Sequence, residues 1–299
     1  MIKTALAGAP ILNEAGIAQI TPGSGYPGLT DAYKGITEPN TEPGKYYPQP
    51  STRTLVRLIP NDVVQVSAAL HLLHSDGCQR VAAWQFGGTI ESVALLKAVS
   101  VRAPHYKMTY YSSPPLGTDT KTYIEYAHGL AVAGVHCAIL VGTVTPAAVA
   151  LTTELHEQLP EGSAIVGSSG FCTPRWLHGI PTSLVKSVAA GLYCMTPALP
   201  VQKYINGRRF IHVFRLAYHH GPSAYDYYGY EAAQLVIRAV RDLVPGEDPR
   251  TTVTSSILGD LVSGELGWYA FDGGDSSSSV YGVDTFVDGI PRHHTTVTP

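Results

Sequence analysis

The chain has 299 residues, 44% of them hydrophobic and 14% charged, so it can bury one large core or two lobes, and its composition excludes a disordered protein. The formal net charge of -3 and the lack of a basic stripe with interleaved aromatic residues argue against a nucleic-acid partner. No apolar run reaches the roughly 18–20 residues that a membrane-spanning helix needs.

The first elements predict a helix, a strand and a loop. Residues 2–15 carry small and apolar side chains at helical spacing and end at Gly16, and residues 17–21 form a short apolar run. Residues 22–28, Pro-Gly-Ser-Gly-Tyr-Pro-Gly, are turn formers directly after that run. Backbone N–H groups of such a loop can meet a ligand, although a plain connecting loop is the alternative.

The next stretch predicts a surface loop, a strand and a helix. Residues 31–51 are rich in Pro, Gly, Glu and Tyr without a period, which indicates an irregular loop. Residues 53–59 alternate like a strand, and residues 61–73 are typical of a helix with Asn61 or Asp62 as its N-cap.

Five short apolar runs organise the middle of the chain, alternating with segments of helical spacing. They are residues 80–84, 107–111, 138–142, 164–167 and 191–196. This alternation is the pattern of βαβ units and predicts a doubly wound α/β lobe with a parallel sheet. Ligands of such lobes lie beyond the carboxyl ends of the strands. We therefore expect ligand-contacting residues at 85–88, 112–115, 143–146, 168–171 and 197.

The four cysteines fall in two pairs in this lobe. Cys78 and Cys137 each precede a strand, and the two strands are neighbours in the common 2-1-3-4-5 order. Cys172 and Cys194 belong to the fourth and fifth strands, which are also neighbours. Two disulfides would indicate an oxidising compartment, and four buried free thiols are the alternative.

The last third of the chain changes pattern. Residues 204–218, 224–243 and 251–261 predict helices, and residues 268–271 and 281–287 predict strands, with a turn at 272–275. His212, His219, His220 and Asp226 lack metal-ligand spacing, so we interpret them as solvated. We expect His293 and His294 to lie in a disordered tail. The tyrosines of the second helix could line a cleft, but a core-facing role is favoured: Tyr225, Tyr227, Tyr228 and Tyr230.

Several segments, taken in order, resemble type 1 periplasmic-binding proteins, the solute receptors of branched-chain-amino-acid-type ABC importers. The first is Ala9-Pro10-Ile11-Leu12-Asn13-Glu14-Ala15-Gly16-Ile17 with Tyr26-Pro27-Gly28-Leu29-Thr30. Further segments are Arg57-Leu58-Ile59-Pro60-Asn61-Asp62, Tyr228-Gly229-Tyr230-Glu231-Ala232-Ala233 and Phe271-Asp272-Gly273-Gly274-Asp275. The resemblance covers the chain from Ala5 to about Pro291.

This resemblance implies two α/β lobes of the type 1 periplasmic-binding fold, each with a doubly wound parallel sheet, that trap a solute in a cleft. The first lobe would hold residues 1–59 and 201–266, and the second would hold residues 60–200 and 267–299. The family's first lobe begins with strands and helices that precede the helix at the start of this chain. We therefore expect an incomplete first lobe and a true N-terminus, with its signal peptide, upstream, and a genuine minimal variant of the fold is the alternative.

The resemblance also implies ligand-binding positions. In the first lobe they are Gly23, Ser24, Gly25 and Tyr26, whose hydroxyls and amides would hold a carboxylate. In the second lobe they are Phe86, Gly87, Thr143, Val144, Ser168, Ser169 and Gly170.

The second-lobe positions depart from the family's amino-acid-binding pattern. A phenylalanine replaces the usual tyrosine at 86, the third-strand loop has no aromatic residue, and the fourth-strand loop has no acid. An ammonium buried without a counter-charge costs several kcal/mol. The sequence therefore favours a less polar solute, or an acid without the amine. Plain packing of Phe86 in the core, and strand termination by the serines, are the alternatives.

The expected function is that of a monomeric, extracytoplasmic solute-binding protein of an ABC importer, without enzymatic activity, metal or other cofactor. Its partners would be a small amino-acid-like or less polar organic solute and the transporter permease. The alternatives are the ligand-sensing domain of a signalling receptor, an α/β enzyme, for which no convincing catalytic set is found, and a fragment that cannot fold alone.

Overall fold

The computed structural model describes residues 2–112, 120–259 and 261–299 and divides the chain into two compact units. The first lobe consists of residues 1–61 and 198–280, and the second of residues 62–197 and 281–299. Residues 267–280, expected in the second lobe, therefore belong to the first. The reason is a parallel pairing of Asp275 with Arg57, which the sequence pattern did not reveal.

The second lobe is a doubly wound α/β structure. Its helices and strands are α2 (Asp62–Ser75), β3 (Arg80–Phe86), α3 (Ile90–Arg102), β4 (Thr109–Ser112), α4 (Thr120–Val132), β5 (Cys137–Gly142), α5 (Pro146–Gln158), β6 (Ala164–Gly167), α6 (Val185–Ala190), β7 (Leu192–Thr196), β12 (Tyr281–Val287) and β13 (Ile290–Val297). The sheet order is β13-β12-β7-β6-β5-β3-β4. The five predicted strands thus form a parallel sheet in the predicted 2-1-3-4-5 order.

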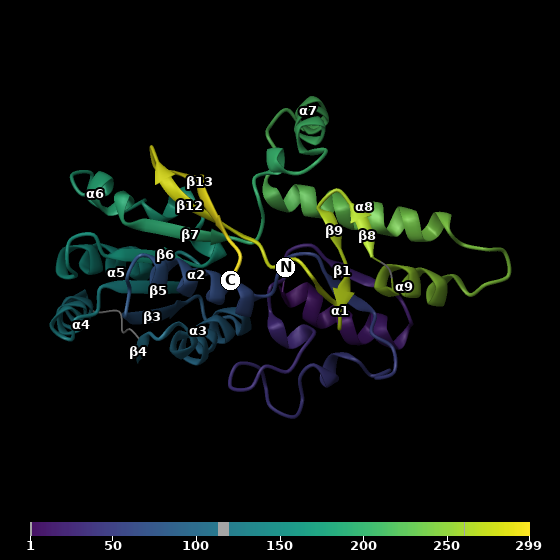
Figure 1. Cartoon of the computed structure of the whole chain (residues 1–299), viewed down its shortest axis with the longest axis horizontal. Helices are drawn as coiled ribbons and strands as arrows, with labels where there is room; N and C mark the ends of the chain where they lie inside the picture. The colour runs from purple at the N-terminus through teal and green to yellow at the C-terminus, as the bar shows by residue number, and fades with distance from the viewer. Residues whose placement is uncertain (1, 113–119, 260) are drawn as a thin grey trace. The chain divides into compact units, whose positions relative to one another are not determined.

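Alternating side chains of these strands meet helices on both faces of the sheet (Figure 1). Ala138 and Leu140 pack into a core with residues of α4, α5 and α6. Ile139 and Val141 of the same strand line a small void with residues of α2 and α3. Because both of its faces are covered, β5 is apolar throughout rather than alternating in polarity.

The hairpin of β12 and β13 closes one edge of this sheet. β12 runs antiparallel to β7, and β13 runs antiparallel to β12. His293 and His294, expected in a disordered tail, lie within β13 instead. The alternation of exposed and half-buried side chains in β13 leaves little apolar signal, which is why the sequence did not predict a strand there.

The first lobe consists of α1 (Ile2–Glu14), β1 (Gln19–Thr21), β2 (Leu55–Arg57), α7 (Gly207–Tyr218), α8 (Ala224–Arg241), α9 (Pro249–Gly259), β8 (Val262–Gly264), β9 (Gly267–Tyr269), β10 (Phe271–Asp272) and β11 (Asp275–Ser276). One sheet has the order β1-β2-β11-β10, and β8 pairs with β9. β1 and β2 are parallel, as are β2 and β11. The predicted helices and strands are present, and the loop at 31–51 contains only short helical turns such as η2 (Gly44–Tyr46).

A buried glutamate joins α8 to the β8–β9 ribbon. Glu231 is fully buried, and its carboxylate accepts hydrogen bonds from the Tyr269 hydroxyl, from Arg238 Nη2 at 3.0 Å and from the Glu265 N–H at 2.9 Å. A buried carboxylate is stable when its oxygens are paired in this way. Among the predicted tyrosines of α8, Tyr227 and Tyr228 are buried, which fits the core-facing interpretation, whereas Tyr230 is 38% exposed.

Two disulfides join neighbouring strands of the second lobe. Cys78 is bonded to Cys137, with a Cα–Cα distance of 6.3 Å, and Cys172 is bonded to Cys194, with 5.3 Å. Both pairs are the strand neighbours expected from the sequence. The first link lies at the amino end of β3 and β5, and the second lies near the carboxyl end of β6 and β7.

Candidate functional site

The predicted first-lobe ligand loop follows β1 directly. Gly23 is half-buried, whereas Ser24, Gly25 and Tyr26 are buried. The Ser24 N–H donates to Thr21 Oγ1 at 3.2 Å, which closes the turn onto the end of the strand. The loop then passes into a short 3-10 turn, η1 (Pro27–Leu29). The loop backbone is thus joined to the end of β1 and to a regular turn, an arrangement that suits a preformed binding loop.

A buried arginine donates hydrogen bonds to the backbone of this loop. Arg57, the last residue of β2, has no exposed side-chain surface. Its Nη1 donates to the Ser24 carbonyl at 3.2 Å and to the Tyr26 carbonyl at 2.7 Å, and its Nη2 donates to Thr30 Oγ1. Asp275 of β11 balances the charge, at 2.7 Å from Nη2. Neither residue stood out in the sequence as part of a site, because the two are far apart in the chain.

The Tyr26 side chain points into the lobe. It is 2% exposed, and its hydroxyl donates to Glu42 Oε2 at 2.6 Å. Burial together with this hydrogen bond raises the pKa of Tyr26 well above its ordinary value. Burial alone would raise the pKa of Glu42, but hydrogen bonds from Tyr26, from the Glu38 N–H, from Lys45 and from Tyr46 lower it. The Tyr26 hydroxyl is thus already paired, and this residue supports the loop from inside.

In the second lobe, the predicted residues lie where β3, β5 and β6 end. Phe86 is 6% exposed and contacts Phe171 edge to face, with 6.1 Å between ring centroids, so its ring belongs to the core. Gly87 is exposed and has a φ of +88°, and a Cβ there would lie 2.8 Å from Thr143 Oγ1. Gly87 and the exposed Thr143 are therefore neighbours at the carboxyl edge of the sheet.

The loops after β5 and β6 also meet closely. A Cβ at Gly170 would lie 2.0 Å from the Gly142 carbonyl oxygen, so only glycine allows these two backbones to approach. Val144 is half-buried and packs against the core of the lobe. The structure thus brings Gly87, Thr143 and Gly170 together as the sequence predicted for loops at strand ends.

The two serines after β6 hold the strand ends together. Ser168 is 4% exposed, and its Oγ accepts from the Gly142 N–H at 2.9 Å. The Ser169 N–H donates to Oε1 of the buried Gln65 on α2 at 2.7 Å. The hydroxyl of Ser168 thus has a structural partner, and Gln65 is a further polar group beneath this edge that no sequence pattern indicated. A ligand-binding role of both serines stays a prediction.

A half-buried acid of the closing hairpin, Asp284, lies near the same edge of the second-lobe sheet. Asp284 of β12 accepts from Thr196 Oγ1 at 3.0 Å, and His293 Nδ1 lies 3.7 Å from its other oxygen. Burial raises the pKa of Asp284, although the hydrogen bond from Thr196 and the charge of His293 oppose that rise. Asp284 comes from the closing hairpin, so no strand-end motif pointed to it.

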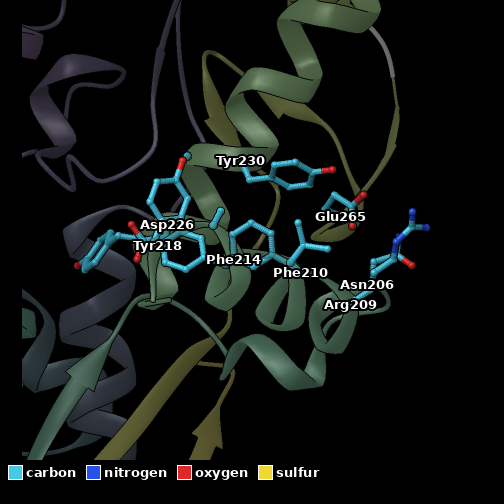
Figure 2. Close-up of a pocket in the computed structure, with 12 residues that line it drawn as sticks. Asn206, Arg209, Phe210, Phe214, Tyr218, Asp226, Tyr230 and Glu265 are labelled. Carbon is cyan, nitrogen blue, oxygen red and sulfur yellow. The ribbon is translucent and has the colours of Figure 1, made fainter. Parts of the chain in front are cut away.

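An apolar groove lies on the first lobe between α7 and α8 (Figure 2). It encloses about 680 Å³, and Figure 2 shows Phe210 and Phe214 of α7 beside Tyr230 of α8. Phe210 lies 5.2 Å from Tyr230 between ring centroids. Along α7, only Gly207 is buried, and Val213 and Leu216 are 55% and 67% exposed. The groove contains none of the predicted ligand residues.

Potential metal ligands in the described ranges form two groups, and both depend on disulfide-bonded cysteines. One group is Cys78, His136 and Cys137, and the other is Cys172, Cys194 and Asp284. Thiols that are joined in disulfides offer no thiolate to a metal. His212 of α7, and His219 and His220 just after this helix, interpreted from the sequence as solvated, are exposed. Within the described part of the chain, no helix has the length and hydropathy of a membrane span.

Comparison with known proteins gives the fold. No protein-family model matches the chain. No curated protein sequence matches it either. Solved structures do match, and three of them represent the kinds of protein found.

The first is the ABC transporter substrate-binding protein from Desulfitobacterium hafniense in complex with Leu, with 18% identity and a TM-score of 0.73 over 98% of this chain and 78% of that one. The second is the leucine-binding protein LivK from Thermotoga maritima, with 18% identity and a TM-score of 0.70 over 99% and 77%. The third is a solute-binding protein of an ABC transporter from R. palustris in complex with benzoate, with 13% identity and a TM-score of 0.66 over 99% and 75%.

Because the chain covers about three quarters of each neighbour, the match agrees with the expected incomplete first lobe. The chain has the fold of type 1 periplasmic-binding proteins.

Proposed function

We propose that this chain is an extracytoplasmic solute-binding protein of an ABC importer and that its solute is a small organic carboxylate without an α-ammonium group. The observation that carries the proposal is the loop after β1, where Arg57 turns two backbone carbonyls inward. The Ser24 carbonyl leaves the N–H of Gly25 on the opposite side of its peptide, whereas the Tyr26 carbonyl precedes Pro27, which has no N–H. Backbone N–H donors near a preformed loop suit an anionic oxygen.

The second-lobe positions support a solute without an ammonium group. Gly87, Thr143, Val144, Ser169 and Gly170 are all neutral, and the hydroxyl of Ser168 already bonds to the Gly142 backbone. An ammonium group would need a carboxylate partner there, because burying it alone costs several kcal/mol. Asp284 is a poor candidate for that partner, since burial favours its neutral form and Thr196 already donates to it.

The ligands of the structurally similar proteins suggest two solute classes to compare, an amino acid and an aromatic acid. One of them was solved with Leu and another with benzoate. Leucine carries the carboxylate and the ammonium, whereas benzoate carries only the carboxylate on an apolar ring. A solute that resembles benzoate fits the neutral residues of the second lobe better than leucine does.

A thermal-shift assay with acids and a neutral control compound tests this proposal. The chain is melted with benzoate, 4-hydroxybenzoate, leucine and benzamide, each over a concentration series. Ligand binding to the folded state raises the melting temperature by mass action. We expect a concentration-dependent rise with the aromatic acids that exceeds the rise with leucine, and none with benzamide, which has the ring but lacks the charge. A larger rise with leucine than with benzoate would contradict the solute class.

A substitution at Thr143 tests the contribution of the second lobe. Thr143→Asp places a negative charge at the exposed carboxyl edge, beside Gly87. We expect weaker binding of benzoate, because like charges repel near a low-dielectric surface. Glu161→Gln, at an exposed position at the opposite end of the same sheet, is the control and should leave benzoate binding unchanged. Equal affinities of the wild type and Thr143→Asp would argue against this edge as part of the site.

A further inference from the structure

Arg57 uses every hydrogen-bond donor that an arginine has. Its Nε donates to Asp275 Oδ1 at 2.9 Å, and Nη2 donates to the same oxygen at 2.7 Å and to Thr30 Oγ1. Its Nη1 donates to the carbonyls of Ser24 and Tyr26. A guanidinium has five N–H donors in a rigid plane, so these contacts fix both its position and its rotation. Lysine, with three donors on a flexible stem, cannot reproduce them.

The direction of these bonds sets the direction of the loop amides. In a trans peptide, the carbonyl of one residue and the N–H of the next point to opposite sides of the same plane. Because the Ser24 carbonyl points at Arg57, the Gly25 N–H points away from it. The Tyr26 carbonyl precedes Pro27, which has no N–H, so Gly25 is the donor that this arrangement presents.

The Gly25 N–H forms no hydrogen bond to any residue within 2–112, 120–259 and 261–299, although Gly25 is buried. A buried N–H without a partner is rare in native proteins and costs free energy. Such an amide in a ligand loop is therefore a candidate donor to a ligand oxygen.

Asp275 extends the arrangement to the end of the first lobe. Its Oδ2 accepts from Asn61 Nδ2 at 2.8 Å, and Asn61 Nδ2 also donates to the Tyr33 hydroxyl at 3.0 Å. Asn61 is the last residue of the first lobe before the chain enters the second. The same carboxylate thus holds Arg57 and the residue at which the chain leaves this lobe.

We propose that Arg57, held by Asp275, is a positioning residue for solute binding: it orients the Gly25 N–H to donate to the carboxylate of the solute. Arg57 does not touch the solute itself, since its side chain has no exposed surface. The inference rests on the proposed function for the identity of the ligand, but the orientation of the Gly25 amide can be measured without any ligand.

A conservative variant and a matched control separate this role from plain stabilisation. Arg57→Lys keeps the positive charge opposite Asp275 and removes the planar guanidinium with its five N–H donors. Arg53→Lys is the control, because Arg53 Nη1 bonds to the same loop at the Thr30 carbonyl, at 3.2 Å, without reaching the carbonyls of Ser24 or Tyr26. Benzoate is the probe. Calorimetry measures its affinity, and NMR of the ¹⁵N-labelled protein follows the Gly25 amide.

For Arg57→Lys we expect benzoate affinity to fall about tenfold or more, the size of one lost charge-assisted hydrogen bond, and the Gly25 amide resonance to shift in the ligand-free protein. Arg53→Lys should stay within about twofold of the wild type, since its loop contact is remote from Gly25. A folded Arg57→Lys protein with wild-type affinity and an unmoved Gly25 resonance would overturn the inference.

Two further outcomes remain decisive. If Arg57→Lys does not fold, Thr30→Val takes its place, because it removes one acceptor of Nη2 and keeps the Arg57–Asp275 pair. An unmoved Gly25 resonance in that variant overturns the inference. If the wild type binds no carboxylate, the proposed function fails, while the Gly25 resonance of the variants still decides whether Arg57 orients that amide.

Discussion

Replacing Asp275 by asparagine should destabilise the first lobe selectively. The side chain keeps its size and one carbonyl oxygen, so Arg57 still finds an acceptor, but the buried guanidinium loses its counter-charge. Asparagine also presents an NH₂ group where Oδ2 now accepts from Asn61. The substitution therefore removes charge without creating a cavity.

The magnitude follows from the burial of the two partners. Arg57 has no exposed side-chain surface, and that of Asp275 is 22% exposed. Breaking a fully buried pair costs about 3–5 kcal/mol, and the partial exposure of Asp275 reduces the expected loss to about 2–3 kcal/mol. For a domain of this size, a loss of that order lowers the melting temperature by about 4–10 °C.

The tryptophans allow the two lobes to be followed separately. Trp84 and Trp176 are buried in the second lobe, whereas Trp268 of the first lobe is 71% exposed. Urea unfolding followed by far-UV circular dichroism reports both lobes, and the emission shift of the buried tryptophans reports the second. We expect the Asp275→Asn protein to lose helical signal at lower urea concentration while the tryptophan transition moves less.

The control lies in the same hairpin. Asp272 pairs with Asp275 across β10 and β11 but is exposed, so Asp272→Asn removes an equal charge from the surface. Its expected effect is within about 0.5 kcal/mol. The reasoning is refuted if Asp275→Asn and Asp272→Asn give the same midpoints.

Three more measurements test other parts of the structure. Glu42→Gln should destabilise the chain at pH 7, and this loss should shrink as the pH falls below 4.5. The lowered pKa of Glu42 stabilises the fold above its ordinary value of 4.5, and that stability is lost as the pH falls through the folded value. Thermal melts of both proteins from pH 7 to pH 3 check this, and a loss that does not change with pH would contradict it. Asp284→Asn should gain stability relative to the wild type as the pH rises above 3.8, because the raised pKa of Asp284 means that the folded wild type holds this proton more tightly than the unfolded chain does. Urea midpoints of the two proteins at pH 3 and pH 7 check this, and a difference between them that is the same at both pH values would count against it. The two disulfides join cysteines that are 59 and 22 residues apart. On the chain-entropy model, reducing them should lower the free energy of unfolding by about 3–4 kcal/mol for each bond. Urea unfolding in a phosphine reductant measures this loss, and an unchanged midpoint would contradict it.

The sequence was most informative where a pattern repeats. Apolar runs of strand length alternate with helical segments from residue 80 to residue 196, and right-handed crossovers leave few ways to arrange them. The common 2-1-3-4-5 order placed the strands of Cys78 and Cys137 side by side, and the structure bonds these two cysteines, which the sequence left open as a disulfide or free thiols. Residues that follow strands, such as Gly87 and Thr143, could also be placed at one edge of the sheet, because parallel strands end on the same side.

The contacts around Arg57 could not be predicted in the same way. Its partner Asp275 is 218 positions away, and β11 has two residues, too few to show a period. For the same reason, residues 267–280 were expected in the wrong lobe. The hydrogen bonds of Tyr26 and Ser168 depend on exact side-chain directions, which local sequence does not encode.

Calorimetric titration of the chain with benzoate and with leucine, at matched pH and salt, tests the central claim most directly. The two ligands share the carboxylate and differ in the ammonium group, for which the predicted second-lobe positions offer no acid. We predict measurable binding of benzoate and an affinity for leucine that is weaker by about tenfold or more, the minimum cost of an unpaired ammonium group. Tight binding of leucine, with benzoate weak or absent, would contradict the account.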